Sequence, residues 1–225
     1  LAELSGVRSG HGVILPAVPP GTTDQMSTKL TADPEAKAER RRKVLVGAGA
    51  LTAIAVVGGL VTLAVIQNPP PQAREDIEIA GLQTFEGLSA NHVSTPVDYE
   101  QSPPVGGDHA SAWLNCGVYT EAVPNENAVH ALEHGAAWVA YDSEALSQEQ
   151  VDALRTALPA AYVVLAPYEG LDSPIVLSAW QAQVAVDSPE DERIEQFVAE
   201  YWHSPDAPEP GAACTGGLDA PGRIA

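Results

Sequence analysis

The chain has 225 residues, a length that suits one large domain or two small ones. It carries 30 acidic and 11 basic residues, and the net charge of −19 at pH 7 argues against non-specific binding to nucleic acid or to anionic lipid. The apolar fraction of 45 % is typical of a globular protein, and two cysteines are too few for a disulfide-rich scaffold or a four-cysteine zinc site.

The charge is divided unevenly about one long apolar segment. Residues 1–66 hold seven basic and five acidic residues, whereas residues 67–225 hold four arginines, no lysine and twenty-five acidic residues. Residues 44–66 contain no charge at all. At about 1.5 Å per residue, a helix of this length reaches across a hydrocarbon core of about 30 Å. We therefore predict a single transmembrane helix over residues 44–66.

The basic residues 40–43 stand directly before this apolar segment, and the next basic residue is Arg74. The positive-inside rule then predicts a cytoplasmic N-terminus and a C-terminal domain outside the cell membrane. A cleaved signal peptide is the alternative, but its apolar region would be about half as long and would end in small residues. No cysteine follows closely, which excludes a lipoprotein anchor. An uncleaved signal anchor is favoured.

The segments around this helix are expected to lack a packed core. We predict that residues 1–43 form a disordered cytoplasmic leader. Because Met26 is the only methionine, translation is expected to start there. Residues 67–76 include three consecutive prolines, which favour a stiff, extended stalk. An extracytoplasmic domain follows over residues 77–215, and the Pro- and Gly-rich residues 216–225 are expected to form a flexible tail.

Hydrophobic periodicity within residues 77–215 predicts both strands and helices. Strands are expected at residues 91–99, 136–141 and 162–166 and within 175–186. Helices are expected from the N-cap Asn125 to Gly135, behind the capping box 147–150, and after Ser188-Pro189. This order predicts an α+β fold, with one small mixed sheet of about four strands and packed helices.

His130 and His134 form the most informative pair in the sequence. Residues four apart lie on one face of a helix, so both imidazoles can grip a single ion. Leu132 lies nearly opposite, and if it faces the core, the histidines face a cleft or the surface. Two ordinary surface histidines are the alternative interpretation.

His92 and His109 complete a cluster in which four of the chain's six histidines fall between positions 92 and 134. Two or three of the four can converge on a metal, and copper(II) and zinc both accept imidazole. The outer domain has no methionine, which excludes a thioether site for copper(I). Glu133 is expected to orient a ligating histidine from outside the coordination shell. His203 follows the last predicted helix and is expected at the surface.

Residues 130–134 also match the pattern H-x-x-E-H of one class of zinc hydrolase. That mechanism needs a helix that continues past the second histidine and a carboxylate ligand from a later helix, for which Glu195 and Glu200 are the candidates. Gly135 is expected to end the helix at once. An enzymatic activity is therefore the less favoured interpretation.

Cys116 and Cys214 both lie outside the membrane on this topology. That compartment is oxidising, so we predict a disulfide between them. Two free thiols, or a thiolate metal ligand near His109, are the alternatives.

Several short motifs together resemble the actinobacterial domain-of-unknown-function family catalogued under number 3105. The matching positions are Pro103-Pro104, Gly107-Asp108-His109, Trp113, Cys116-Gly117, Tyr119, Val129-His130, Leu132-Glu133-His134-Gly135, Ala179-Trp180 and Phe197. Where Pro-Pro-x-Ser-Gly is expected before the first histidine, this chain has a glycine in place of the serine. The resemblance implies an envelope location and a shared histidine site, and it implies no activity.

The sequence therefore predicts a membrane-anchored extracytoplasmic domain that binds a copper or zinc ion. Such a protein would act as a metal carrier or as an accessory of an envelope complex. A structural or interaction subunit of a membrane complex, for example a respiratory one, is the alternative, with histidines that are only structural. A zinc-dependent hydrolase is the second alternative. No nucleic-acid partner is expected.

Overall fold

The computed structural model describes residues 33–67 and 76–224. The expected start at Met26, most of the leader and most of the Pro-rich stalk lie outside the described residues.

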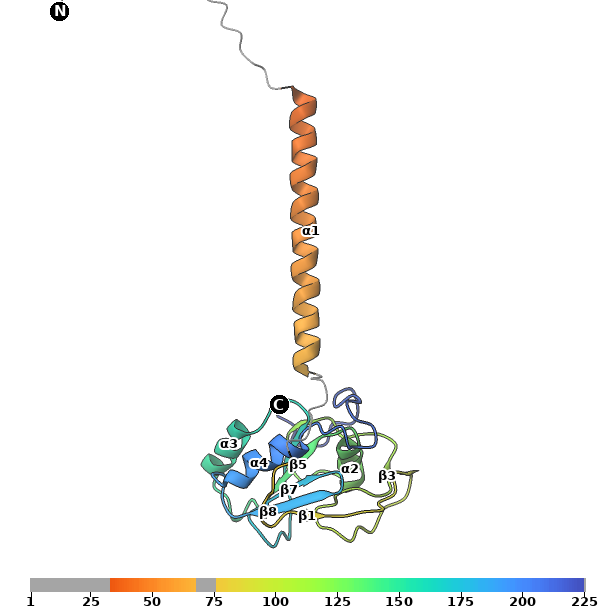
Figure 1. Ribbon diagram of the computed structural model, residues 1–225, viewed down its shortest axis with the longest axis vertical. Helices are drawn as coiled ribbons and strands as arrows, with labels where there is room; N and C mark the ends of the chain where they lie inside the picture. Colours follow the sequence, from red (N-terminus) through yellow and green to blue (C-terminus); the bar gives the residue numbers. More distant parts are fainter. Residues whose placement is uncertain (1–32, 68–75, 225) are drawn as a thin grey trace, which may run out of the picture. The chain divides into compact units, whose positions relative to one another are not determined.

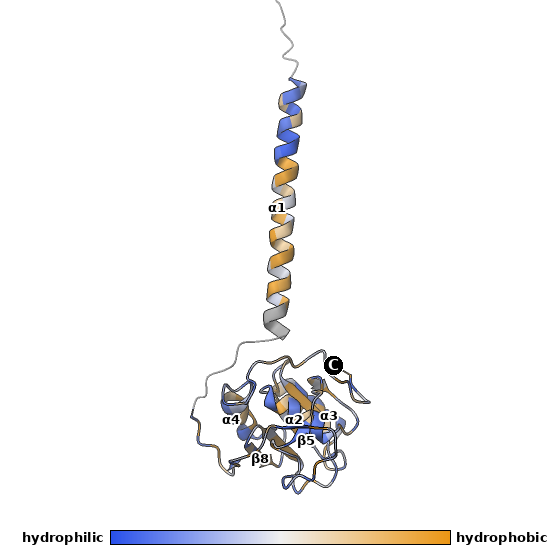
Figure 2. Cartoon of the chain, turned by 90° about the vertical axis from the view of Figure 1, so that its right-hand side faces the viewer, coloured by the Kyte–Doolittle hydropathy of each residue, from blue (hydrophilic) through white to orange (hydrophobic). Residues whose placement is uncertain are grey.

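The N-terminal helix α1 (Pro34–Gln67) contains the predicted apolar segment. Its part from Pro34 to Leu63 is long and apolar enough to serve as a membrane anchor or a signal segment. Figure 2 shows a hydrophilic first part of α1 followed by a mostly hydrophobic stretch. The helix begins ahead of residue 44, within the leader that was expected to be disordered. The Asp33 carboxylate caps it by accepting a bond from the Glu35 amide, and proline suits the first helical position.

The outer domain is a six-stranded mixed sheet with helices on both faces (Figure 1). The strand order is β1 (Gln83–Thr84), β8 (Ala182–Val186), β7 (Ile175–Ala179), β5 (Ala137–Tyr141), β6 (Val163–Pro167) and β4 (Gly117–Val118). Strands β5, β6 and β4 pair in parallel, and β7, β8 and β1 add antiparallel pairs. The predicted α+β class is confirmed, with more strands than expected because the two edge strands have only two residues each.

The core lies in two layers, one on each face of this sheet. Along β5, Val139 and Tyr141 point to the layer that contains α3 (Gln148–Ala157) and α4 (Glu192–Tyr201). Trp138 and Ala140 point to the layer that contains α2 (Asn125–Glu133). All five residues of β5 are therefore buried, as expected for a central strand covered on both faces.

The helix boundaries agree only in part with those read from the sequence. The capping box of α3 is present, with Ser147 and Gln150 bonded reciprocally. The predicted start of α4 at Ser188-Pro189 is wrong, because Ser188 forms a turn with the Glu190 amide instead. Asp191 is the N-cap, and its carboxylate accepts a bond from the amide of Arg193 and pairs with the guanidinium of the same residue.

The predicted strand over residues 91–99 is almost entirely absent. Only β2 (His92–Val93) forms, and it pairs in parallel with β3 (His109–Ala110) in a separate two-stranded sheet. Proline at position 96 has no amide hydrogen for a strand ladder, and this explains why the alternating pattern does not extend the strand.

The C-terminal residues expected to be a flexible tail instead pack on the domain as far as they are described. The Asn115 side chain donates to the Gly217 carbonyl and the Asp219 carboxylate and accepts from the Gly217 amide. Leu218 forms a bridge with Leu114, and Arg223 forms one with Tyr119. Because these contacts satisfy backbone and side-chain polar groups, the composition alone was a poor guide to order here.

Candidate metal centre

Helix α2 supplies three of the candidate residues at its C-terminal end. His130, Glu133 and His134 follow one another at spacings that place them on neighbouring positions of a helical turn. Gly135, with a φ of 95°, ends the helix as predicted. Its amide donates to the Leu132 carbonyl and the next amide donates to the Ala131 carbonyl, which is a Schellman ending.

The expected capping of α2 by Asn125 is wrong, since Pro124 occupies the N-cap position and no side chain caps the helix. Asn125 is the first helical residue, and its amide group donates to the Tyr168 hydroxyl. Leu132 meets the condition stated from the sequence, because it is fully buried in the layer against the sheet. The two histidines of α2 are themselves only 3 % exposed and therefore do not lie on an open surface.

The small sheet of β2 and β3 brings the other two histidines to the end of α2. His92 and His109 are direct partners in this strand pair, and the His109 amide donates to the Asn91 carbonyl. Asp108 ties the two strands together, because its carboxylate accepts bonds from the Ser89 hydroxyl at 2.6 Å and the Asn91 amide group at 2.9 Å. These bonds lower the pKa of the Asp108 carboxyl group below its ordinary value.

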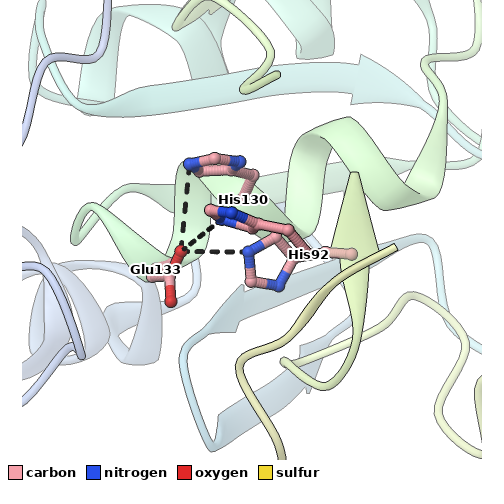
Figure 3. Close-up of side chains that lie close together, drawn as sticks. His92, His130 and Glu133 are labelled. Atoms are coloured by element: carbon pink, nitrogen blue, oxygen red, sulfur yellow. Dashed lines mark hydrogen bonds and ion pairs between the residues drawn. The ribbon is translucent and has the colours of Figure 1, made fainter. Parts of the chain in front are cut away.

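Three imidazoles converge on one oxygen of Glu133. The Nε2 atoms of His109, His92 and His130 lie 3.0, 3.7 and 3.8 Å from Glu133 Oε2. Figure 3 shows His92 and His130 directed at this carboxylate. All four ligand atoms lie within 4.8 Å of one another. Donors about 2.0–2.1 Å from a tetrahedral zinc ion lie roughly 3.3 Å apart, so the spacing suits one small ion.

Backbone carbonyls accept hydrogen bonds from the Nδ1 atoms of His109 and His130. His109 Nδ1 donates to the Gly107 carbonyl at 2.8 Å, and His130 Nδ1 donates to the Ala110 carbonyl at 2.7 Å. Since a carbonyl oxygen can only accept, each Nδ1 carries a hydrogen, and in a neutral ring the Nε2 then presents a lone pair. Metal-ligating histidines are oriented in this way.

Burial governs the charge of this cluster. Desolvation lowers the pKa of His130, and it lowers the pKa of His134 as well, so both rings favour the neutral form that binds metals. The Glu133 side chain is only 4 % exposed, and its Oε2 is hydrogen-bonded to His109 Nε2 at 3.0 Å, so a proton or a metal cation must lie among these buried groups. The His92 side chain is 46 % exposed and forms the open side of the cluster.

His134 does not join the three histidines around Glu133 Oε2. Its Nδ1 donates to the Ala213 carbonyl at 2.7 Å, and its Nε2 lies 3.6 Å from the Glu209 carboxylate. Glu133, His134 and Glu209 form a second group whose ligand atoms lie within 4.8 Å of one another. Sequence reasoning missed Glu209, because an isolated glutamate in a Pro-rich segment carries no spacing signal.

A disulfide between Cys116 and Cys214 is present, with a Cα–Cα distance of 5.3 Å. It fixes the segment that carries Glu209 and Ala213 beside the end of α2, and a backbone bond from the Cys116 amide to the Cys214 carbonyl reinforces it. The two alternatives for the cysteines, free thiols and a thiolate metal ligand, are thereby excluded.

Two tryptophans flank the cluster. The Trp113 ring lies 5.8 Å from the His130 ring and 5.3 Å from the His134 ring, centroid to centroid, and the Trp180 ring lies 6.1 Å from the His109 ring. Their proximity gives the cluster a built-in fluorescence reporter.

The expectation that His203 lies at the surface is wrong. It is fully buried, and its ring packs 3.8 Å from the Tyr162 ring, centroid to centroid. Its amide donates to the Gly135 carbonyl, so the turn after α4 folds back against the end of α2. Among the described residues, His203 belongs to neither candidate metal group.

The sequence model of the family described as "Protein of unknown function (DUF3105)" matches residues 92–216. The chain belongs to this family. The matched segment begins at His92 and contains all the residues of both candidate metal groups, together with both cysteines. No curated protein and no solved structure matches the chain. The apolar helix and the disulfide are together features of a secreted or membrane-anchored extracytoplasmic domain.

Proposed function

We propose that this protein is a membrane-anchored, extracytoplasmic metal-binding protein whose ion is held by His92, His109, His130 and Glu133. The observation that carries the proposal is the convergence of three Nε2 atoms on Glu133 Oε2, at 3.0 to 3.8 Å. His109 Nε2 is hydrogen-bonded to that oxygen, but ring nitrogens and a carboxylate oxygen this close repel one another unless a proton or a metal cation lies among them. A divalent metal ion supplies that positive charge.

The donor set indicates a divalent transition metal. Three imidazole nitrogens and one carboxylate oxygen suit zinc and copper(II), and the cysteines are unavailable because they form the disulfide. For a given nitrogen and oxygen site, copper(II) binds more tightly than zinc. We therefore expect copper(II) to displace zinc from this protein, and the metal held in the cell to depend on supply.

The set also favours carriage of the metal over catalysis. Four protein donors leave no open position on a tetrahedral ion, whereas catalytic zinc sites keep one for water. His92, half exposed on a two-residue strand, is the donor that can leave most easily. Its departure would open one position toward solvent, which suits exchange of the ion with a partner. We propose a metal carrier or an accessory of an envelope complex.

The zinc-hydrolase alternative has less support. It requires His130 and His134 to bind one ion with Glu133 free to act as a base, but Glu133 Oε2 lies among the ring nitrogens. The helix ends at Glu133, and of the two candidate carboxylates on α4, Glu195 is exposed. Glu200 accepts a bond from the Ile77 amide.

The test uses the full-length chain, purified in detergent and stripped of metal. Zinc is titrated at an ionic strength of about 0.5 M, which suppresses loose binding to a highly acidic protein. We expect at least one tightly bound ion in the wild type. His130→Ala should abolish tight binding, and His92→Ala, a change at an exposed position that leaves the fold intact, should weaken it.

Thr95→Ala is the matched control, because Thr95 is exposed three residues after His92 and offers no imidazole or carboxylate ligand. It should bind zinc as the wild type does. If the folded wild type binds no ion tightly, or if neither histidine variant changes binding, the metal proposal is refuted. The interaction-subunit interpretation then takes its place.

A further inference from the structure

The structure assigns a second metal position to Glu133, His134 and Glu209, next to the first and sharing the Glu133 carboxylate. This inference rests on the proposed function only for that shared residue. A carboxylate has two oxygens and about four lone-pair sites, so one group can serve two ions. Paired metal sites in proteins use such an arrangement, with the ions about 3.5–4 Å apart.

His134 is prepared for this role in the same way as the histidines of the first site. Its Nδ1 is occupied by the Ala213 carbonyl at 2.7 Å, so in the neutral ring its Nε2 presents a lone pair. That nitrogen lies 3.6 Å from Glu209 Oε2. The His134 side chain is 4 % exposed. A buried, correctly oriented imidazole facing a carboxylate is what distinguishes this group from a chance surface pair.

Backbone hydrogen bonds fix the geometry of this second position, although its ligand Glu209 comes from the C-terminal segment. The Glu209 amide donates to the Glu133 carbonyl at 3.0 Å, and the Gly211 amide donates to the His134 carbonyl at 3.2 Å. The disulfide at Cys214 anchors the same segment. Glu209 is therefore held over the end of α2 from both sides, and its side chain moves only by rotamer changes.

The chemistry of this position differs from that of the first. It offers one imidazole and two carboxylates, a harder set than three imidazoles and one carboxylate. Water completes the coordination, because the Glu209 side chain is 56 % exposed. With fewer protein ligands and a second cation close by, it binds its ion more weakly. We assign it as the outer position, where a divalent ion first meets the protein before it moves to the three histidines.

The experiment counts zinc ions bound to the full-length chain in detergent at high ionic strength. The wild type should bind two ions in two classes of affinity. Glu209→Gln removes one charge and keeps the shape of the side chain, and it should lose the weaker ion alone. Glu195→Gln is the matched control, since it removes an exposed charge on α4. It should retain both ions.

Copper(II) provides a readout that counting does not. Two copper ions that share one carboxylate couple magnetically, so the paramagnetic resonance signal per copper should fall when the second equivalent is added. In Glu209→Gln this loss should disappear. Two independent copper signals in the wild type, or an unchanged zinc count in Glu209→Gln, would overturn the inference.

The failure of this inference is distinguishable from failure of the first site. A wild type that binds one tight ion and no second ion, with the same count in Glu209→Gln and His134→Ala, refutes the second position and leaves the three-histidine site intact. Absence of any tight ion refutes both. His130→Ala should remove the tight ion while a weak one, sensitive to Glu209→Gln, remains.

Discussion

His92 and His109 are direct partners across two strands of only two residues each, and their rings lie 4.9 Å apart, edge to face. Residues seventeen positions apart in the chain thus contribute neighbouring imidazoles. The pairing depends on the Asp108 carboxylate, which holds Ser89 and Asn91 beside the second strand.

Asp108→Ala should weaken zinc binding without unfolding the domain. The variant loses both bonds that align the strand of His92 with His109, and removal of such supporting contacts costs roughly 10–100-fold in metal affinity. Both bonds are accepted by Oδ1, so Asp108→Asn, which keeps that oxygen, should restore most of the affinity. Asp172→Ala is the control at an exposed aspartate. Equal affinities in all four proteins would show that Asp108 has no positioning role.

Glu133→Gln should change the metal-free and metal-bound proteins in opposite directions. Without metal, the variant removes a buried charge and its amide group can donate to a ring nitrogen, so the melting temperature should stay equal or rise. Zinc should raise the melting temperature of the wild type, since an ion at 100 times its dissociation constant adds about 2.7 kcal/mol. That increase should vanish in the variant. Thermal melts with and without zinc check both halves.

The metal-free protein should lose stability as the pH falls below about 6.5, the ordinary pKa of histidine. Burial lowers the pKa of His130 and of His134 in the folded state, so below pH 6.5 the unfolded chain binds protons that the folded chain does not. The free energy of unfolding is therefore highest above the unfolded-state pKa of these rings. It decreases as the pH falls from there through their folded-state pKa. Denaturant titrations between pH 5 and pH 8 measure this slope.

Replacing both histidines tests whether they cause this pH dependence of stability. His130→Gln combined with His134→Gln should flatten the dependence over the same pH range, because glutamine does not titrate. An equally steep loss of stability in the double variant would attribute the effect to other groups.

Removal of the disulfide should destabilise the domain and affect the two metal positions unequally. The bond closes a loop of 98 residues in sequence separation, and loss of a native disulfide of this kind costs about 2–5 kcal/mol. Cys116→Ser combined with Cys214→Ser frees the segment that carries Glu209, so the weaker ion should be lost. The tight ion should persist, since none of its four ligands lies in that segment. Denaturant titration and zinc counting measure the two effects.

The membrane orientation can be tested in cells from which the wall has been removed. The basic residues 40–43 precede the apolar part of α1, so an N-terminal tag should be protected from added protease while the domain is digested. A detergent-permeabilised sample is the control, and there the tag should be digested too. A protected domain in intact cells would contradict the topology.

Sequence reasoning succeeded where the signal is local. The spacing of His130 and His134 and the opposite placement of Leu132 follow from helical geometry, and the capping box of α3 follows from hydrogen-bond chemistry. It carries no information where distant segments decide the outcome. The partition of His130 and His134 between two groups depends on which segments approach from outside the helix, and no periodicity encodes that choice.

Long-range contacts also explain why the C-terminal residues and His203 differ from what the sequence suggested. Pro- and Gly-rich composition suggested a flexible tail, but Asn115, far earlier in the chain, satisfies the backbone of Gly217. His203 was expected to be exposed because it follows a helix, yet the turn after that helix folds against Gly135. In both cases long-range contacts overrode the local composition.

The ligands of the two metal groups come from four stretches of chain, around residues 92, 109, 130–134 and 209. An unfolded polypeptide holds these stretches far apart, so it offers no site that could capture an ion during synthesis. On the proposed function, metal loading would therefore follow folding. The ion would then be selected by the metal pool of the compartment where the domain folds, and a change of compartment would change the metal without any change of sequence.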